Sequence, residues 1–146
     1  IAGLIVTFVV GYDVAHTETP VVKAEVVVKS PVPSPTPFVE PTDIEGYIRY
    51  KFGQDSPKAF LLLQGDGTPG SCAENKKLNP NALNDNTEWG GVGRDRGYWQ
   101  INDVYHSTVS DICAKDVKCS TDYAFRMYTN DGKSFKRWTC GREYGI

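Results

Sequence analysis

Six of the nine prolines lie between Thr17 and Pro41, in a stretch that contains no glycine. Proline fixes φ and lacks an amide donor, so the alternate prolines of PVPSPTP favour an extended, polyproline-like segment over any helix. We therefore predict an extended linker over residues 17–41. The folded part is then one small domain, residues 42–146, because the remaining length supports a single hydrophobic core.

The chain begins with an apolar run, IAGLIVTFVV, over residues 1–10. A membrane-spanning helix needs about 20 apolar residues, so this run is too short to span a bilayer by itself. We interpret residues 1–16 as a partial signal peptide or membrane anchor. Tyr12, Asp13 and His16 interrupt the small-residue pattern of a cleavage site, which favours an uncleaved anchor. A buried strand or an ordinary apolar terminus is the alternative.

The charges of the folded part are balanced. Residues 42–146 hold 14 basic and 14 acidic residues, and the whole chain has a net charge of -2. Binding to nucleic acid requires a basic face that neutralises phosphates, so we expect no nucleic-acid partner. A neutral domain fits an uncharged or mixed-charge ligand better than a polyanion.

Capping signals predict two consecutive helices at the start of this domain. Thr42-Asp43-Ile44-Glu45 matches a capping box, and Gly53 is placed to end the helix that follows. Ser56-Pro57 reads as an N-cap with proline at the first helical position. The run Ala59–Leu63 is apolar on nearly all sides, so we expect this second helix to be buried.

The rest of the domain shows one further helix and long loops. A helix is expected from Ser120 or Thr121 to Gly132, with an apolar stripe that includes Ala124 and Tyr128. Residues 65–70, GDGTPG, can only form a loop. A short strand near Tyr98–Ile101 is the single β element predicted, so the fold class is mainly α with at most a short β element.

All four cysteines lie in the folded part. Behind an exporting segment they are expected to form two disulfides, with three possible pairings, of which Cys113–Cys119 with Cys72–Cys140 is preferred. No C-x-x-C pair is present and the chain has only two histidines. We therefore expect no metal site and no cofactor.

Two segments carry the polar residues that could do chemistry. The first, Cys72–Asn75, contains Glu74, and the second, Gly97–Ile101, reads GYWQI. An amide between large aromatic side chains suits a sugar-binding cleft, where sugar rings stack on aromatic faces. A carboxyl group beside such residues is partly desolvated, which raises its pKa as a general acid for glycosidic cleavage requires.

In this order the segments resemble the lysozyme-like superfamily, in particular soluble lytic transglycosylases and goose-type lysozymes. The family pattern is a catalytic Glu-Ser at a helix end, a Gly-Leu-Met-Gln-Ile type segment, a helix with Ala and Tyr, and a closing aromatic-Gly-Tyr stretch. The matching residues here are Glu74-Asn75, Gly97–Ile101, Ala124 with Tyr128, and Trp138–Tyr144. The resemblance covers most of residues 42–146 and implies an α+β lysozyme-like fold.

Two departures from the family pattern stand beside this resemblance. Asn75 replaces the serine of the Glu-Ser pair. The loop at residues 65–70 separates the buried helix from Glu74, whereas in the family a continuous helix holds the glutamate. A non-catalytic wall-binding module is therefore one alternative, and a disulfide-stapled toxin or inhibitor is another.

The resemblance implies cleavage of the β-1,4 bond between N-acetylmuramic acid and N-acetylglucosamine in peptidoglycan, with Glu74 as the catalytic acid. A one-glutamate lytic transglycosylase is favoured. In the alternative, a hydrolytic lysozyme, Asp85 or Asp95 would position water. The resemblance further implies that substrate contacts come from Asn75, Asp95, Tyr98, Trp99, Gln100, Tyr128 and Tyr144.

The expected partners are peptidoglycan glycan strands, together with a membrane if the N-terminal segment anchors the chain. We expect a monomer that is exported and acts outside the cytoplasm, either membrane-anchored or secreted to the cell wall.

Overall fold

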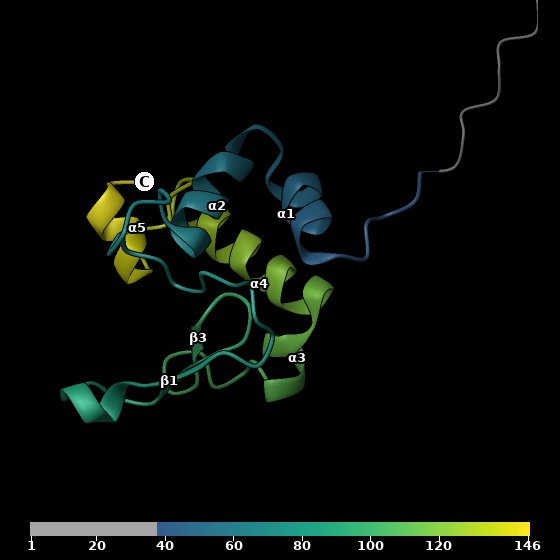
Figure 1. The fold of residues 1–146 in the computed structure, drawn as a ribbon. Helices are drawn as coiled ribbons and strands as arrows, with labels where there is room; N and C mark the ends of the chain where they lie inside the picture. Colours follow the sequence, from purple (N-terminus) through teal and green to yellow (C-terminus); the bar gives the residue numbers. More distant parts are fainter. Residues whose placement is uncertain (1–37) are drawn as a thin grey trace, which may run out of the picture. The chain divides into compact units, whose positions relative to one another are not determined.

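The structure is a computed structural model that describes residues 38–146 (Figure 1). The predicted leader, residues 1–16, and all but the last residues of the predicted linker lie outside the described residues. Within residues 38–146 the fold is mainly helical with a small three-stranded sheet, which confirms the predicted fold class.

The two helices at the start of the domain form where the capping signals predict them. Helix α1 spans Ile44–Phe52, but its N-cap is Asp43 and not Thr42, because the Asp43 carboxylate accepts from the Gly46 amide at 2.7 Å. A 3-10 turn, η1 (Gly53–Asp55), leads into α2 (Ser56–Gln64). The N-cap position of α2 is Asp55, and the Ser56 side chain is buried inside the first turn.

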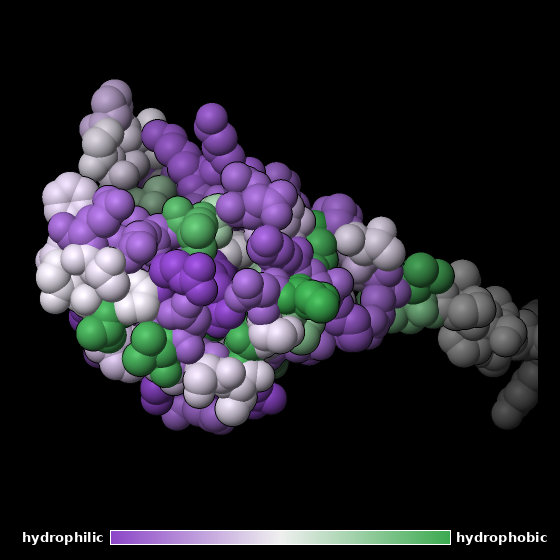
Figure 2. Space-filling view, turned by 90° about the horizontal axis from the view of Figure 1, so that it is seen from below, coloured by the Kyte–Doolittle hydropathy of each residue, from purple (hydrophilic) through white to green (hydrophobic). Residues whose placement is uncertain are grey.

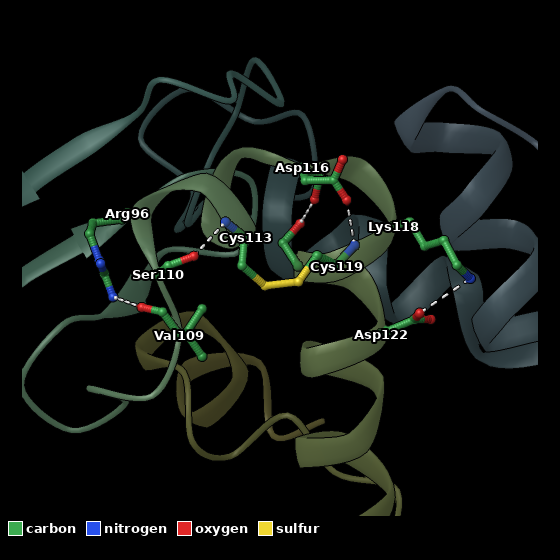
Figure 3. The surroundings of a disulfide bond; sticks show 9 residues. Arg96, Val109, Ser110, Cys113, Asp116, Lys118, Cys119 and Asp122 are labelled. Atoms are coloured by element: carbon green, nitrogen blue, oxygen red, sulfur yellow. Dashed lines mark hydrogen bonds and ion pairs between the residues drawn. A yellow bond between two sulfur atoms is a disulfide. The ribbon is translucent and has the colours of Figure 1, made fainter.

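Helices α3 (Asp111–Lys115) and α4 (Val117–Asn130) form a bent pair joined by a disulfide (Figure 3). Ser110 caps α3 by accepting from the Cys113 amide at 3.1 Å, and Asp116 caps α4 by accepting from the Cys119 amide at 2.7 Å. Helix α4 begins three or four residues before the expected start at Ser120 or Thr121, and α3 was not predicted. A one-turn helix has too little apolar periodicity to be recognised in sequence.

A small antiparallel sheet with strand order β1-β2-β3 lies beside the helices. The strands are β1 (Leu83–Asp85), β2 (Arg94–Arg96) and β3 (Ile101–Asn102), and Asn84 pairs with Asp95. The short 3-10 helix η2 (Asn86–Trp89) stands at the tip of the hairpin that projects from the helices (Figure 1). The predicted strand near Tyr98–Ile101 was wrong for residues 98–100, which form a turn before β3.

The centre of the core is a cluster of aromatic side chains from several elements: Phe52, Trp99, Tyr128, Phe135 and Trp138. Both buried indole N–H groups are satisfied, since Trp99 donates to the Thr121 hydroxyl at 3.0 Å and Trp138 donates to the Trp99 carbonyl at 2.7 Å. Buried tryptophans pack stably when the indole N–H finds an acceptor. These bonds fix Trp99 and Trp138 against each other.

Helix α5 (Thr139–Tyr144) follows this cluster and closes the domain. It packs so closely on the preceding turn that a Cβ at Gly141 would lie 2.0 Å from the Phe135 carbonyl oxygen. The helix was not predicted from sequence, where residues 138–144 were read as a closing aromatic stretch. Helix α5 contacts α2, the helix that precedes the segment with Glu74 in the sequence.

The described surface is mostly hydrophilic on the face shown in Figure 2, where hydrophobic residues stand in separate small groups. The exposed large apolar side chains include Leu83, Val104 and Ile112. Between residues 38 and 146, every helix is too short or too polar to cross a bilayer.

Both disulfides form with the preferred pairing, Cys72–Cys140 and Cys113–Cys119. They close loops of very different length, with sequence separations of 68 and 6 residues. A cross-link restricts the unfolded chain more when the loop it closes is longer.

We predict that the double variant Cys72→Ala/Cys140→Ala loses about 4 kcal/mol of unfolding free energy, and Cys113→Ala/Cys119→Ala about 2 kcal/mol, from loop-closure entropy. Urea denaturation of both variants and the unaltered chain measures the two losses. A larger loss for the Cys113–Cys119 pair would contradict the prediction.

Candidate active site

The segment that carries Glu74 continues the hydrogen-bond ladder of α2 after a loop. Helix α2 ends at Gln64, and residues 65–73 leave the helix axis. The chain then returns, so that the Glu74 amide donates to the Leu62 carbonyl at 3.1 Å and the Asn75 amide to the Leu63 carbonyl at 2.8 Å. An α-helix leaves its last four carbonyls without partners, and here two of them are satisfied from beyond the loop.

The Glu74 backbone therefore occupies the position that the next turn of α2 would take. In an uninterrupted helix the Leu62 carbonyl would accept from residue 66. In this chain residue 66 belongs to the loop at residues 65–70, which departs from the family pattern. The Glu74 amide binds the Leu62 carbonyl in its place. The backbone of Glu74 is fixed by the buried end of α2.

The Glu74 side chain is partly buried and points to the N-terminus of α5. Its Oε1 atom accepts from the Cys140 amide at 2.8 Å. Burial raises the pKa of the Glu74 carboxyl above its ordinary value, and the charge of Asp95 acts in the same direction. The amides of Cys140 and Thr139 and the guanidinium of Arg142 lower the pKa and so partly offset these effects.

The disulfide Cys72–Cys140 joins the two chain segments that this hydrogen bond connects. Cys72 lies two residues before Glu74, and Cys140 supplies the amide that binds the Glu74 carboxyl. Tyr144, which was expected to contact substrate, instead donates its hydroxyl to the Cys72 carbonyl at 2.6 Å. The disulfide and this hydrogen bond hold the Glu74 segment to α5.

Asn75 is a buried linker between the Glu74 segment and the GYWQI segment. Its Nδ2 atom donates to the carbonyls of Asn79, Gly97 and Tyr98 at 3.0–3.2 Å, and its Oδ1 accepts from the Asn79 amide. With 6 % of its surface exposed, Asn75 does not reach the groove described below. These hydrogen bonds give Asn75 a role in positioning the two segments, whereas the sequence analysis expected it to contact substrate.

Residues 97–100 form a tight turn that aims Gln100 at the groove. Gly97 has φ +68, and a Cβ there would lie 1.9 Å from the Ala114 carbonyl oxygen, so only glycine fits. Gln100 also has a positive φ of 48, which costs free energy for a residue with a side chain. Its Nε2 donates to the Gly97 carbonyl at 2.9 Å, which holds the strained turn together.

A groove of 380 Å³ runs between the β-hairpin and the segment that leads into α5. Its hairpin side includes Asn86, Trp89 and Asp95, and its floor includes Gln100 and Asn102. The opposite wall is formed by Arg137, Trp138, Thr139 and Arg142. Glu74 is not one of the lining residues, but its carboxyl accepts from the amide of Cys140, the residue after Thr139 in the groove wall. The lining residues Asp95 and Arg142 also act on the pKa of this carboxyl, so Glu74 adjoins the groove.

Asp95 is the acidic side chain of the groove wall. Its Oδ1 accepts from Asn102 at 2.9 Å. The neighbouring Arg96 forms no ion pair with it among the described residues, because Arg96 is buried, pairs with Asp111 and donates to the Val109 carbonyl. Asp85, the other candidate for a second carboxylate, caps η2 through Thr87 and does not line the groove.

Besides Asn75 and Tyr144, three more of the expected substrate contacts are not among the groove-lining residues. Trp99 and Tyr128 have 0 % and 1 % of their surface exposed, because both belong to the aromatic core. Tyr98 is half-buried and packs against that core. The GYWQI segment therefore contributes packing through its aromatics and a groove-facing amide through Gln100.

The structure adds groove residues that the sequence analysis did not single out. Trp89 and Tyr105 have 83 % and 72 % of their surface exposed and line the groove. His106 also lines it, with its Nδ1 atom 2.9 Å from the Tyr123 hydroxyl. Trp89 ends η2 and is followed by Gly90 and Gly91. A large aromatic side chain directly before two glycines is a signal that the sequence contained.

Comparison with known proteins identifies the middle of this domain. Residues 71–140 match the protein family described as a lysozyme-like domain, which confirms the resemblance to the lysozyme-like superfamily. The match includes Glu74, Asp95, Gln100 and all four cysteines. No curated protein and no solved structure matches the chain.

The raised pKa of Glu74 has a consequence for stability. A carboxyl group whose pKa is higher in the folded state than in the unfolded state destabilises the fold once the pH exceeds its ordinary pKa. We predict that Glu74→Gln is more stable than the unaltered chain at pH 8, and that this gain disappears as the pH falls below about 4.5.

Urea denaturation at several pH values measures this difference. Glu143→Gln, the same substitution at an exposed position of α5, is the control. A gain for Glu74→Gln that does not change with pH would contradict the prediction.

Proposed function

We propose that this lysozyme-like domain cleaves the β-1,4 bond between N-acetylmuramic acid and N-acetylglucosamine in peptidoglycan, as a one-glutamate lytic transglycosylase. A lysozyme-like domain indicates a glycosidase-type enzyme that acts on peptidoglycan. The observation that carries the finer proposal is a partly buried Glu74 of raised pKa at the border of a groove lined by amide and aromatic side chains.

In this mechanism Glu74 acts first as an acid and then as a base. Its protonated carboxyl donates a proton to the glycosidic oxygen that leaves, while positive charge develops on the muramic acid ring. The resulting carboxylate then removes the proton from the 6-hydroxyl of the same sugar, and that oxygen attacks the anomeric carbon to close an anhydro ring. Glu74 ends the cycle protonated again.

The surroundings of Glu74 suit both of these steps. Burial favours the protonated form that the first step needs. The Cys140 amide, at 2.8 Å from Oε1, stabilises the carboxylate that exists between the steps. A carboxyl group that serves first as acid and then as base works best when neither its protonated nor its ionised form is strongly preferred. Burial, which raises the pKa of Glu74, and the Cys140 amide, which lowers it, partly offset each other.

A hydrolytic lysozyme is the second candidate, and the position of Asp95 favours it. This carboxylate faces the groove and interacts electrostatically with Glu74, so it could position a water molecule. The two reactions give different products, because hydrolysis adds one water and leaves a reducing end, whereas transglycosylation leaves an anhydro end. Mass spectrometry of the released fragments distinguishes them.

The organisation of the whole chain is part of this proposal. Residues 42–146 form the catalytic domain, residues 17–41 act as a spacer, and residues 1–16 export or anchor the chain. Two disulfides and a domain that acts on peptidoglycan support a location outside the cytoplasm. There the spacer would let a monomeric domain reach the glycan strands.

We predict that Glu74→Gln lowers the rate of peptidoglycan cleavage by about 10²-fold to 10⁴-fold, the usual contribution of a positioned acid or base. Release of soluble fragments from purified sacculi measures the rate. Glu143→Gln, outside the groove on α5, is expected to keep the full rate. Unchanged cleavage by Glu74→Gln would refute the proposed function.

Trp89 offers a separate test of the groove as the glycan site. An exposed indole at the groove edge can stack on a sugar ring, and its loss should cost about 1 kcal/mol of binding. We therefore predict that Trp89→Ala raises KM about fivefold with little change in kcat. Val104→Ala, at another exposed apolar position outside the groove lining, is the control.

A further inference from the structure

The groove has a side branch. A second hollow of 340 Å³ shares four of its lining residues with the groove: Tyr105, His106, Met127 and Arg137. From there it continues over α4, where it is lined by Tyr123, Arg126 and Asn130. A linear polymer needs only the groove, whereas a groove with a branch fits a polymer that carries side chains.

Two guanidinium groups line the branch, and that of Arg137 is paired with Asp131. Arg126 and Arg137 line it, and none of the described residues that line it is acidic. Burial lowers the pKa of His106, with help from the charges of Arg137 and Arg96, so at neutral pH the positive charge comes from the arginines. The domain as a whole is balanced in charge, so this concentration of guanidinium groups is local.

Arg126 is held in place but keeps its charge unpaired. Its guanidinium lies 4.8 Å from the centre of the Tyr123 ring, and within residues 38–146 it forms no ion pair. Arg137 uses Nε and Nη2 to bind Asp131, and Nη1 has no hydrogen-bond partner among the described residues. Both side chains can therefore donate to an added carboxylate.

We propose that this arginine-lined branch binds the carboxylates of the peptide stem that the muramic acid residues of peptidoglycan carry. The proposal rests on the proposed function, because it takes the glycan to lie in the groove. The stem is attached to the sugar through a lactyl ether and bears free carboxylates. Guanidinium groups bind carboxylates through charge-assisted, often bidentate hydrogen bonds. The domain would then prefer glycan with stems over bare glycan.

Binding to the inactive Glu74→Gln full-length chain tests this without turnover. The probes are a murein tetrasaccharide with its stems, the same glycan after an amidase has removed the stems and the lactyl carboxylates that this hydrolysis exposes have been converted to amides, and the stem-bearing form with its carboxylates amidated. We expect about 10-fold tighter binding of the first probe than of the other two, which corresponds to about 1.4 kcal/mol. The difference should shrink at high salt because it is electrostatic.

Arginine variants in the same Glu74→Gln background locate the effect. Arg126→Gln should lower the preference for stems about fivefold, and Arg126→Glu should remove it. Arg49→Gln is the matched control, because Arg49 lies on α1 at 4.7 Å from the Phe60 ring and outside both hollows. This control should keep the full preference.

Several outcomes would overturn the proposal. These are equal binding of bare and stem-bearing glycan, equal binding of amidated and acidic stems, no measurable binding of any probe, or an equal loss for every probe in Arg126→Gln. A preference for stems that depends on Arg126, found together with no cleavage by the unaltered chain, would support the branch and refute the proposed function. The two failures are thus distinguishable.

Discussion

The arrangement of the site depends on two backbone hydrogen bonds, from the amides of Glu74 and Asn75 to the last buried carbonyls of α2. A helix end that is covered by other chain needs partners for its carbonyls. In this protein those partners come from residues beyond a loop, so the need for hydrogen bonds at the helix end itself brings Glu74 to its place. The Cys72–Cys140 disulfide and the Tyr144–Cys72 hydrogen bond hold the returning segment there.

The same few residues thus hold the fold together and fix the surroundings of the Glu74 carboxyl. Cys140 forms a disulfide through its side chain and binds the Glu74 carboxyl through its amide. Asn75 connects the Glu74 segment to the turn that presents Gln100. Together these contacts fix the position of the Glu74 carboxyl relative to both α5 and the turn that holds Gln100.

The elements of the fold whose sequence signals are local could be predicted. The caps and glycines around α1 and α2 gave those helices to within a residue, and the order of Glu74 and GYWQI pointed to the lysozyme-like fold. Strands of two or three residues carry no alternation, so β1 and β2 were missed. The burial of Trp99 and Tyr128 in the core could not be predicted, because an aromatic residue looks the same in sequence whether it lines a cleft or fills a core.

The loop at residues 65–73 leaves and rejoins the body of the protein at fixed points. At one end the Gly65 amide binds the Leu61 carbonyl, and at the other Cys72 is tied to α5. The entropic cost of closing such a loop rises only slowly as the loop lengthens. Evolution, or a protein engineer, could therefore insert a peptide or a whole module between Gly67 and Gly70, beside the candidate active site, and leave Glu74 where it is.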